Sequence, residues 1–363
     1  MVSISICLPA ELGEQELTSW RRLQREDSRL ASPFLGPEFA LALGRHRDDV
    51  RVAVIEESGQ AVGFFAHQRG RRGVGRALGY GLGNAQGLVH AAAFEWRPRD
   101  LLARCGLAVW EFDNLVPHQV GAFDVRRAAT APAPFIDLSR GWDAWLESKR
   151  AAKVGIGKVQ KSQRRLAREA GEVTFEFDTA ARTDNLKLLM RLKSGQYRRT
   201  GRPDVFARPW VVAVVEDLAD TATPDFTGLL SVLSVAGRPI AVRYSLGANN
   251  MLCAWFSSYE VDLGRYSPGL GSLLEYIRAG CERGYTEIDL AQGHYDYKEM
   301  IKDGDRAVAG GWVERPSAAA TVRRLQQAPR RYVSDFVLSR PGLRQAVRRT
   351  RNRIGHLHNA LRG

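Results

Sequence analysis

The sequence has few cysteines and no long uninterrupted apolar run. Its four cysteines (Cys7, Cys105, Cys253 and Cys281) are far apart, which argues against a zinc site or a disulfide framework. No window holds about 18 consecutive apolar residues, so we expect no transmembrane helix. The first residues lack a basic segment followed by an apolar run, so we expect no secretion signal. These absences predict a cytoplasmic protein without a metal site.

The composition is that of a globular protein with a basic end. The chain has 363 residues, of which 44% are hydrophobic and 26% charged, enough for two domains with apolar cores. The formal net charge is +13, and residues 321–363 contain eleven arginines and a single acid, Asp335. Apolar residues recur at helical spacing within this tail. It is therefore predicted to be a basic amphipathic helix that binds an anionic membrane surface, binds RNA phosphates or packs on the body.

Two segments share one pattern. In residues 52–65 and again in residues 230–244, an alternating apolar run reaches a small residue and a glycine, and a second apolar run follows. The pairs are Ser58-Gly59 and Ala236-Gly237. Such a pair between alternating runs is typical of a tight β-hairpin, because the turn needs positive φ. The spacing of 178 positions, close to half the chain, predicts an internal duplication.

The segment 251–298 carries the chemistry. An apolar strand over 252–258 leads to the glycine turn Pro268-Gly269-Leu270-Gly271, a helix is expected from near Ser272, and a strand follows over 287–291. A helix start leaves backbone N–H groups unpaired and favours negative charge, and glycines allow close approach of a phosphate. We therefore expect a diphosphate on residues 269–272, held mainly by backbone N–H groups.

These residues resemble the acyl-CoA loop of GNAT acyltransferases, Gln/Arg-x-x-Gly-x-Gly/Ala, with Tyr266 at the first position. The longer pattern resembles the double-GNAT CelD/BcsL cellulose-biosynthesis type, which is related to the Fem peptidyltransferases. The matching features are a basic helix at 158–168, Ser267-Pro268-Gly269, a helix at 273–283, Gly284-Tyr285, Asp289 and the ending 293–298.

The resemblance implies an α/β fold with a mixed sheet and tandem GNAT-like domains. The expected division is an N-terminal unit over 1–134 without a clear cofactor loop, a C-terminal unit over 135–318 with the acyl-CoA loop, and the helical tail over 319–363. The implied reaction moves an acyl group, acetyl above all, from acyl-CoA to an amine or hydroxyl acceptor bound between the units. The acceptor would be a small molecule or a glycan.

The resemblance also assigns roles to residues. The expected catalytic residues are Asp289, His294, Tyr297 and Lys298. Those expected to bind the cofactor are Trp255, Phe256, Ser257, Tyr266, Ser267, Gly269, Leu270, Gly271 and Ser272. Those expected to bind the acceptor are Tyr197, Arg243, Gln292 and Asp296.

Several alternatives stay open. A carboxylate or a guanidinium inside a buried strand needs a partner, so Asp289 either orients a catalytic group or pairs with Lys298 or Arg243; the ion pair is slightly favoured. The basic run 158–168 is a solvated helix face or a face that receives an anionic ligand. The function is acyl-CoA-dependent transfer, Fem-like transfer from aminoacyl-tRNA, or a non-catalytic accessory role in polysaccharide or envelope synthesis. The basic tail could bring the protein to the inner membrane face.

Overall fold

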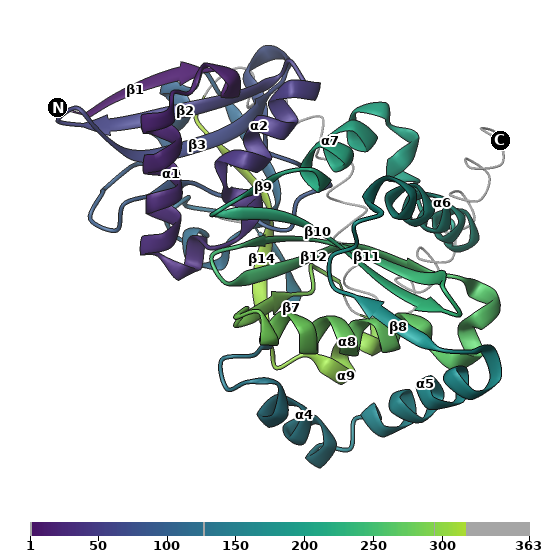
Figure 1. Cartoon of the computed structure of the whole chain (residues 1–363). Coiled ribbons are helices and arrows are strands. Elements are labelled where there is room, and N and C mark those ends of the chain that lie inside the picture. The colour runs from purple at the N-terminus through teal and green to yellow at the C-terminus, as the bar shows by residue number, and fades with distance from the viewer. Residues whose placement is uncertain (1, 126–127, 294, 317–363) are drawn as a thin grey trace, which may run out of the picture.

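The computed structural model describes residues 2–125, 128–293 and 295–316. His294 and the tail over 319–363 lie outside the described residues. Within the described part, no helix is long and apolar enough to cross a membrane. One mixed sheet runs through the molecule in the order β1-β2-β3-β4-β6-β14-β7-β13-β12-β11-β10-β8, with β5 beside β3 and β9 beside β10 (Figure 1). The predicted α/β class is confirmed.

The chain forms two units that share the order strand, two helices, three strands, helix and strand, with additional elements in each. The first contains β1 (Val2–Cys7), α1 (Glu14–Glu26), α2 (Pro37–His46), β2 (Val50–Glu57), β3 (Gln60–Arg69), β4 (Val74–Ala77), β5 (Val89–His90), α3 (Pro98–Arg104) and β6 (Val109–Leu115). The second contains α4 (Trp142–Ala151), α5 (Ile156–Ala170), β8 (Val173–Glu176), α6 (Arg182–Thr200), α7 (Pro209–Ala219), β9 (Ala222–Thr223), β10 (Phe226–Val235), β11 (Arg238–Ala248), β12 (Met251–Tyr259), α8 (Pro268–Glu282), β13 (Glu287–Asp289) and α9 (Asp296–Ile301).

Both predicted hairpins are present, and they match in detail. Each turn has two residues with positive φ, Ser58 and Gly59 in one and Ala236 and Gly237 in the other, as a two-residue hairpin turn requires. Each hairpin also carries a register shift at the same place, three residues before its turn. In each unit an earlier strand pairs with the outer side of the hairpin, β1 with β2 and β8 with β10. The repeat predicted from the two turns therefore extends to the surrounding topology.

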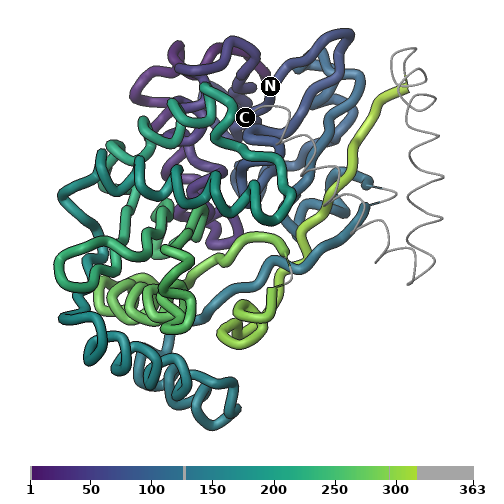
Figure 2. Tube along the Cα trace, turned by 90° about the vertical axis from the view of Figure 1, so that its right-hand side faces the viewer, coloured from purple at the N-terminus to yellow at the C-terminus, as the bar shows by residue number. Residues whose placement is uncertain are grey.

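The two units exchange their final strands. The strand β7 (Ala129–Asp137) follows the first unit but pairs with β13 of the second. The strand β14 (Gly304–Glu314) ends the second unit but pairs with β6 of the first. The two strands also pair with each other, and Figure 2 shows them running side by side between the units. The predicted boundary at residue 134 falls inside β7, and the division there stays a prediction.

The units share their largest hydrophobic core. It contains Phe34 and Phe39 from the first unit together with Val214 and Tyr244 from the second. The ring of Trp255 joins the two sets, since it packs edge-on against Phe34 with 5.3 Å between ring centroids. A continuous apolar core of this kind fixes the relative position of the units.

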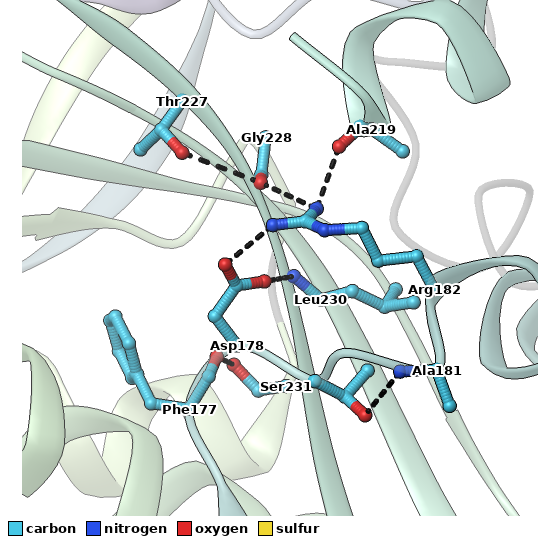
Figure 3. Close-up of polar contacts among 10 residues, drawn as sticks. Phe177, Asp178, Ala181, Arg182, Ala219, Thr227, Gly228, Leu230 and Ser231 are labelled. Carbon is cyan, nitrogen blue, oxygen red and sulfur yellow. Dashed lines mark hydrogen bonds and ion pairs between the residues drawn. The ribbon is translucent and has the colours of Figure 1, made fainter. Parts of the chain in front are cut away.

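Arg182 fastens the start of α6 to the sheet (Figure 3). Its guanidinium donates to the carbonyls of Ala219 at 2.6 Å and Gly228 at 3.1 Å, and it pairs with Asp178. Asp178 in turn accepts from the backbone N–H of Leu230 on β10. Because α6 carries residues of the functional site, this network helps to position that site.

We expect Gly228→Ala to destabilise the fold strongly. A Cβ at this position would lie 2.0 Å from the carbonyl oxygen of Leu218, and backbone cannot move aside as a flexible side chain can. The expected loss in free energy of unfolding is about 3 kcal/mol, measured by urea denaturation. Gly157→Ala is the control, because Gly157 is an exposed helical glycine with nothing within 4 Å of its Cβ position. An equal loss in both variants would contradict the close approach.

Candidate active site

The two central strands of the second unit pair over three residues and then separate. We call the gap between their diverging backbones the opening. Strands β12 and β13 pair in parallel only from Met251 with Glu287 to Cys253 with Asp289. Beyond this point β12 continues to Tyr259, whereas the chain after Asp289 turns away through Ala291, which has a positive φ. The edge of β12 from residue 254 onward is therefore unpaired with β13. This opening is where an extended ligand can lie along the strand.

The corresponding opening in the first unit is filled by the chain itself. Strands β4 and β6 pair in parallel and then separate, but Gln86 returns to the edge of β6. Its side-chain oxygen accepts from the N–H groups of Asp113 and Asn114, and its side-chain nitrogen donates to the Asp113 carboxylate at 2.6 Å. The first unit thus fills its own opening with Gln86, and its Asn84 also donates to the carbonyl of Ala254 at 3.2 Å, where β12 leaves β13.

The helix after β12 begins earlier than predicted. We expected its start near Ser272, but α8 begins at Pro268, a residue well suited to the first helical position because it lacks an N–H. Ser267 before it has positive φ, and its carbonyl accepts from the N–H groups of Leu270 and Gly271. In the described structure, Gly269 keeps a backbone N–H without a backbone partner in this turn. The expectation that backbone N–H groups hold a diphosphate stays a prediction, and in this conformation the N–H groups of Leu270 and Gly271 are bonded to Ser267.

Side chains already pack against both predicted loop glycines. A Cβ on Gly269 would lie 2.9 Å from the ring of Tyr259, and a Cβ on Gly271 would lie 2.2 Å from the side-chain amide of Gln163. Gln163 comes from α5 and donates to the carbonyls of Tyr266 at 2.8 Å and Ser267 at 3.3 Å. The two glycines thus make room for side chains in this structure.

Tyr266 does not face the opening. It is 1% exposed, and its hydroxyl donates to Glu169 of α5 at 2.8 Å and accepts from Arg265 at 2.7 Å. The position that resembles the first residue of the GNAT loop therefore anchors α5 to the loop. Leu270 packs in the core under α8, and Ser272 is buried there with its hydroxyl unpaired among the described residues.

The residues of β12 that were expected to bind the cofactor differ in their contacts. Trp255 donates its indole N–H to the carbonyl of Leu82 in the first unit at 2.8 Å, and Phe256 is buried beside it. Both side chains therefore belong to the shared core. The carbonyl of Ser257, by contrast, accepts from the ammonium of Lys193 at 3.1 Å. Beyond the pairing with β13, the carbonyls of Ala254 and Ser257 are therefore already bonded to side chains.

Asp289 lies where the strands separate, and its expected ion pair is absent. One carboxylate oxygen accepts from the N–H of Ala291 at 2.8 Å, and the other lies 3.7 Å from the thiol of Cys253. In the described part of the chain, no ion pair joins Asp289 to Lys298 or Arg243, so that favoured interpretation is wrong. Burial raises the pKa of the Asp289 carboxyl to about 6. A carboxyl with this pKa can accept a proton near neutral pH.

Three cations lie near the point where β12 and β13 separate; two of them are buried, and Lys193 is half-buried. Arg243 on β11 is 6% exposed and reaches only the carbonyl of Gly269, at 3.5 Å. Lys298 on α9 is 3% exposed and donates to the carbonyls of Ala291 and Gln292. Lys193 on α6 completes the set. Burial lowers the pKa of both lysines to about 8; charges on Arg202, Arg243 and Lys298 also lower that of Lys193, whereas Asp289 partly offsets the lowering at Lys298.

Sequence reasoning missed Lys193. The residue lies on the same face of α6 as the buried Leu189, four positions earlier, so its spacing placed a lysine on the apolar side of a helix. A charged residue in that register is costly unless it serves a site. That signal could have identified it.

Tyrosines lie among the cations. Lys193 lies over the ring of Tyr197, Lys298 over Tyr295 and Arg243 over Tyr276, with distances to the ring centroids between 5.2 and 5.5 Å. Burial raises the pKa of Tyr197 to about 12, and it also raises the pKa of Tyr297. The latter side chain is 37% exposed. Of the other expected acceptor residues, Gln292 and Asp296 have exposed side chains.

Comparison with protein families assigns the second unit. Residues 157–299, which include α5 to most of α9, match the family model described as acetyltransferase (GNAT) domain. The second unit is therefore similar to a GNAT domain over these residues. The GNAT fold and an acyl-transfer chemistry are therefore supported, whereas the CelD/BcsL subfamily stays a prediction. No curated protein sequence matches the chain.

Solved structures share the fold over most of the chain. FemX has a TM-score of 0.57 at 9% identity, over 82% of this chain and 94% of FemX. The C-terminal domain of a lysylphosphatidylglycerol synthetase from Agrobacterium fabrum has a TM-score of 0.52 at 15% identity, over 88% and 97%. The L-PGS of Bacillus licheniformis has a TM-score of 0.50 at 13% identity, over 87% and 96%. Identities this low show a common fold alone.

No candidate metal site accompanies the GNAT domain in the part of the chain that the structure describes. There, no group of three or more His, Cys, Asp or Glu side chains is arranged to hold an ion.

Proposed function

We propose that the chain is an acyltransferase that moves an acyl group from acyl-CoA to an amine or hydroxyl, using the opening between β12 and β13. The observation that carries the proposal is the parallel pairing of these strands over three residues followed by their separation, inside the segment that matches the GNAT model. The unpaired edge of β12 can bind the extended arm of the cofactor, with a backbone N–H there facing the oxyanion that forms on the thioester carbonyl.

Two side chains would move the protons. The acceptor nitrogen or oxygen attacks the thioester carbon, its proton passes to the Asp289 carboxylate, and the carbon–sulfur bond breaks. The departing thiolate takes a proton from the hydroxyl of Tyr297, since a tyrosine is protonated at neutral pH. His294 stays a predicted catalytic residue outside the described part of the chain.

Calorimetric titration with acetyl-CoA tests this function. We expect saturable binding and a higher melting temperature in its presence, because a ligand of the folded state stabilises it. Absence of both effects at millimolar acetyl-CoA would contradict acyl-CoA as the donor.

The packing of Gln163 favours a second candidate donor, aminoacyl-tRNA. Its side-chain amide occupies the place beside Gly271 that a diphosphate would need. The exposed side of α5 next to it carries Lys158, Lys161, Arg164 and Arg168, which suit the phosphates of a nucleic acid. FemX and the lysylphosphatidylglycerol synthetases share the fold with this chain. Co-purification of tRNA that RNase removes, without acetyl-CoA binding, would favour this donor.

We expect Gln163→Ala to separate the two donors. If the diphosphate of acyl-CoA binds beside Gly271, removal of the amide relieves a steric cost and increases acetyl-CoA affinity several-fold, by about 1 kcal/mol. Gln160→Ala, one helical turn earlier on α5, is the control. Titration calorimetry of both variants measures the effect. Unchanged or weaker binding in Gln163→Ala would contradict a diphosphate at this position.

A further inference from the structure

We propose that the opening between β12 and β13 contains a subsite for an oxyanion, a phosphate or carboxylate group carried by one of the two substrates. This inference rests on the acyl-transfer site proposed above and names the substrate chemistry that the site selects. Lys193 on α6, Arg243 on β11 and Lys298 on α9 form the subsite, and Arg243 lies across β12 from the opening, opposite Ser257.

The first argument is that two buried cations and one half-buried cation form no ion pair within the described residues. Lys193 and Lys298 donate to backbone carbonyls, and the guanidinium of Arg243 has a single long contact with a carbonyl. Its Nε has no hydrogen-bond partner among the described residues. Asp289 is the acid whose charge acts on Lys298, yet it forms no ion pair with that lysine within the described residues and supplies one negative charge against three positive ones. The cluster therefore carries excess positive charge.

The second argument is that several other buried or half-buried cations of the same unit do form ion pairs, although Arg208 contacts only a carbonyl and the ring of Trp210. Lys149 forms an ion pair with Asp303 at 2.7 Å, and Arg306 forms a two-bond pair with Glu287. A lone buried charge is costly, because water solvates it better than protein does. Three cations around one opening are explained by a ligand that supplies the missing negative charge.

The third argument is the kind of groups that surround the cations. The rings of Tyr197 and Tyr295 each face a lysine, and Tyr297 stands beside Tyr295 with 5.9 Å between ring centroids. An aromatic face attracts a cation but carries no net negative charge. The rings can therefore position the ammonium groups, while the positive charge remains uncompensated. Arg243 adds a planar fork that suits two oxygens of one phosphate or carboxylate.

Inorganic phosphate is the probe that tests the subsite in the full chain. We expect phosphate to raise the melting temperature of the wild type in a saturable manner, relative to chloride at equal ionic strength. The apparent affinity should be weaker by about tenfold or more in Lys193→Met, the loss expected for one charge-assisted hydrogen bond. Lys187→Met on the same helix is the control, because Lys187 is exposed, and its response should equal that of the wild type.

A second arm distinguishes the source of the anion. If saturating CoA abolishes the phosphate effect, the subsite binds a phosphate of the donor; if both effects add, it binds an acidic group of the acceptor. Either result supports the subsite, and the phosphate response is readable even if acetyl-CoA does not bind. No phosphate effect in the wild type, or an equal effect in Lys193→Met, would overturn the proposal.

Discussion

Arg243→Met should raise the melting temperature by a few degrees and reduce transfer about 100-fold or more. Methionine has a similar length and removes a buried charge that forms no ion pair within the described structure, a change worth roughly 2 kcal/mol. Activity falls because a substrate anion loses its guanidinium partner. Thermal denaturation and steady-state kinetics of the same preparation measure the two effects.

Arg306→Met is the matched control. Arg306 also lies in the sheet, but it pairs with Glu287, so its replacement leaves a carboxylate without its partner. We expect that variant to melt at a lower temperature than the wild type. A lower melting temperature in Arg243→Met as well would show that Arg243 stabilises the fold, and the interpretation as a binding residue would fail.

Asp289→Asn should abolish the acidic limb of the pH profile and lower kcat/KM about 100-fold or more, the usual contribution of a general base. In the wild type, kcat/KM should fall as the pH drops below about 6, because the carboxyl then becomes protonated. The asparagine keeps an acceptor for the N–H of Ala291, so the turn after β13 is preserved. Wild-type pH dependence in the variant would assign the base to another residue.

The same substitution should change the free energy of unfolding in a direction that depends on pH. Burial raises the pKa of Asp289 above its ordinary 3.8, so the folded state binds the proton more tightly than the unfolded state. The free energy of unfolding therefore falls as the pH rises from about 4 through about 6. We expect Asp289→Asn to be more stable than the wild type at pH 7 and no more stable near pH 4.

Asp137→Asn is a control in which the pKa of the carboxyl is lowered and not raised in the folded state. Hydrogen bonds from Ser139 lower the pKa of this exposed carboxyl on β7, so its ionised form favours the folded state at neutral pH. Its replacement should not stabilise the protein at pH 7. Stabilisation of equal size in both variants would point to a general effect of lower negative charge.

Local features of the fold could be predicted from the sequence. The two hairpins were found because a small residue followed by glycine demands positive φ, a requirement that acts within four residues. The strand–helix–strand order of 251–298 was also predicted, since the apolar spacing changes there from strand to helix. The helix start was wrong by four residues, because Pro268 serves as its first residue and Ser267 makes the turn.

Long-range features could not be predicted. The exchange of β7 and β14 joins residues 150 or more positions apart, and no local pattern specifies it. The expected pairing of Asp289 with Arg243 fails for a similar reason. Asp289 lies opposite Cys253 and Arg243 opposite Ser257, four residues further along β12, which is about 13 Å of strand.

Hydrogen exchange with and without acetyl-CoA tests the central claim most directly. If the donor lies in the opening of the second unit, amides of residues 254–259 on β12 should gain protection on saturation with acetyl-CoA. Amides of β4 and β6 should not change, because Gln86 fills the corresponding opening of the first unit. Protection confined to the first unit, or binding that leaves β12 unchanged, would contradict the account.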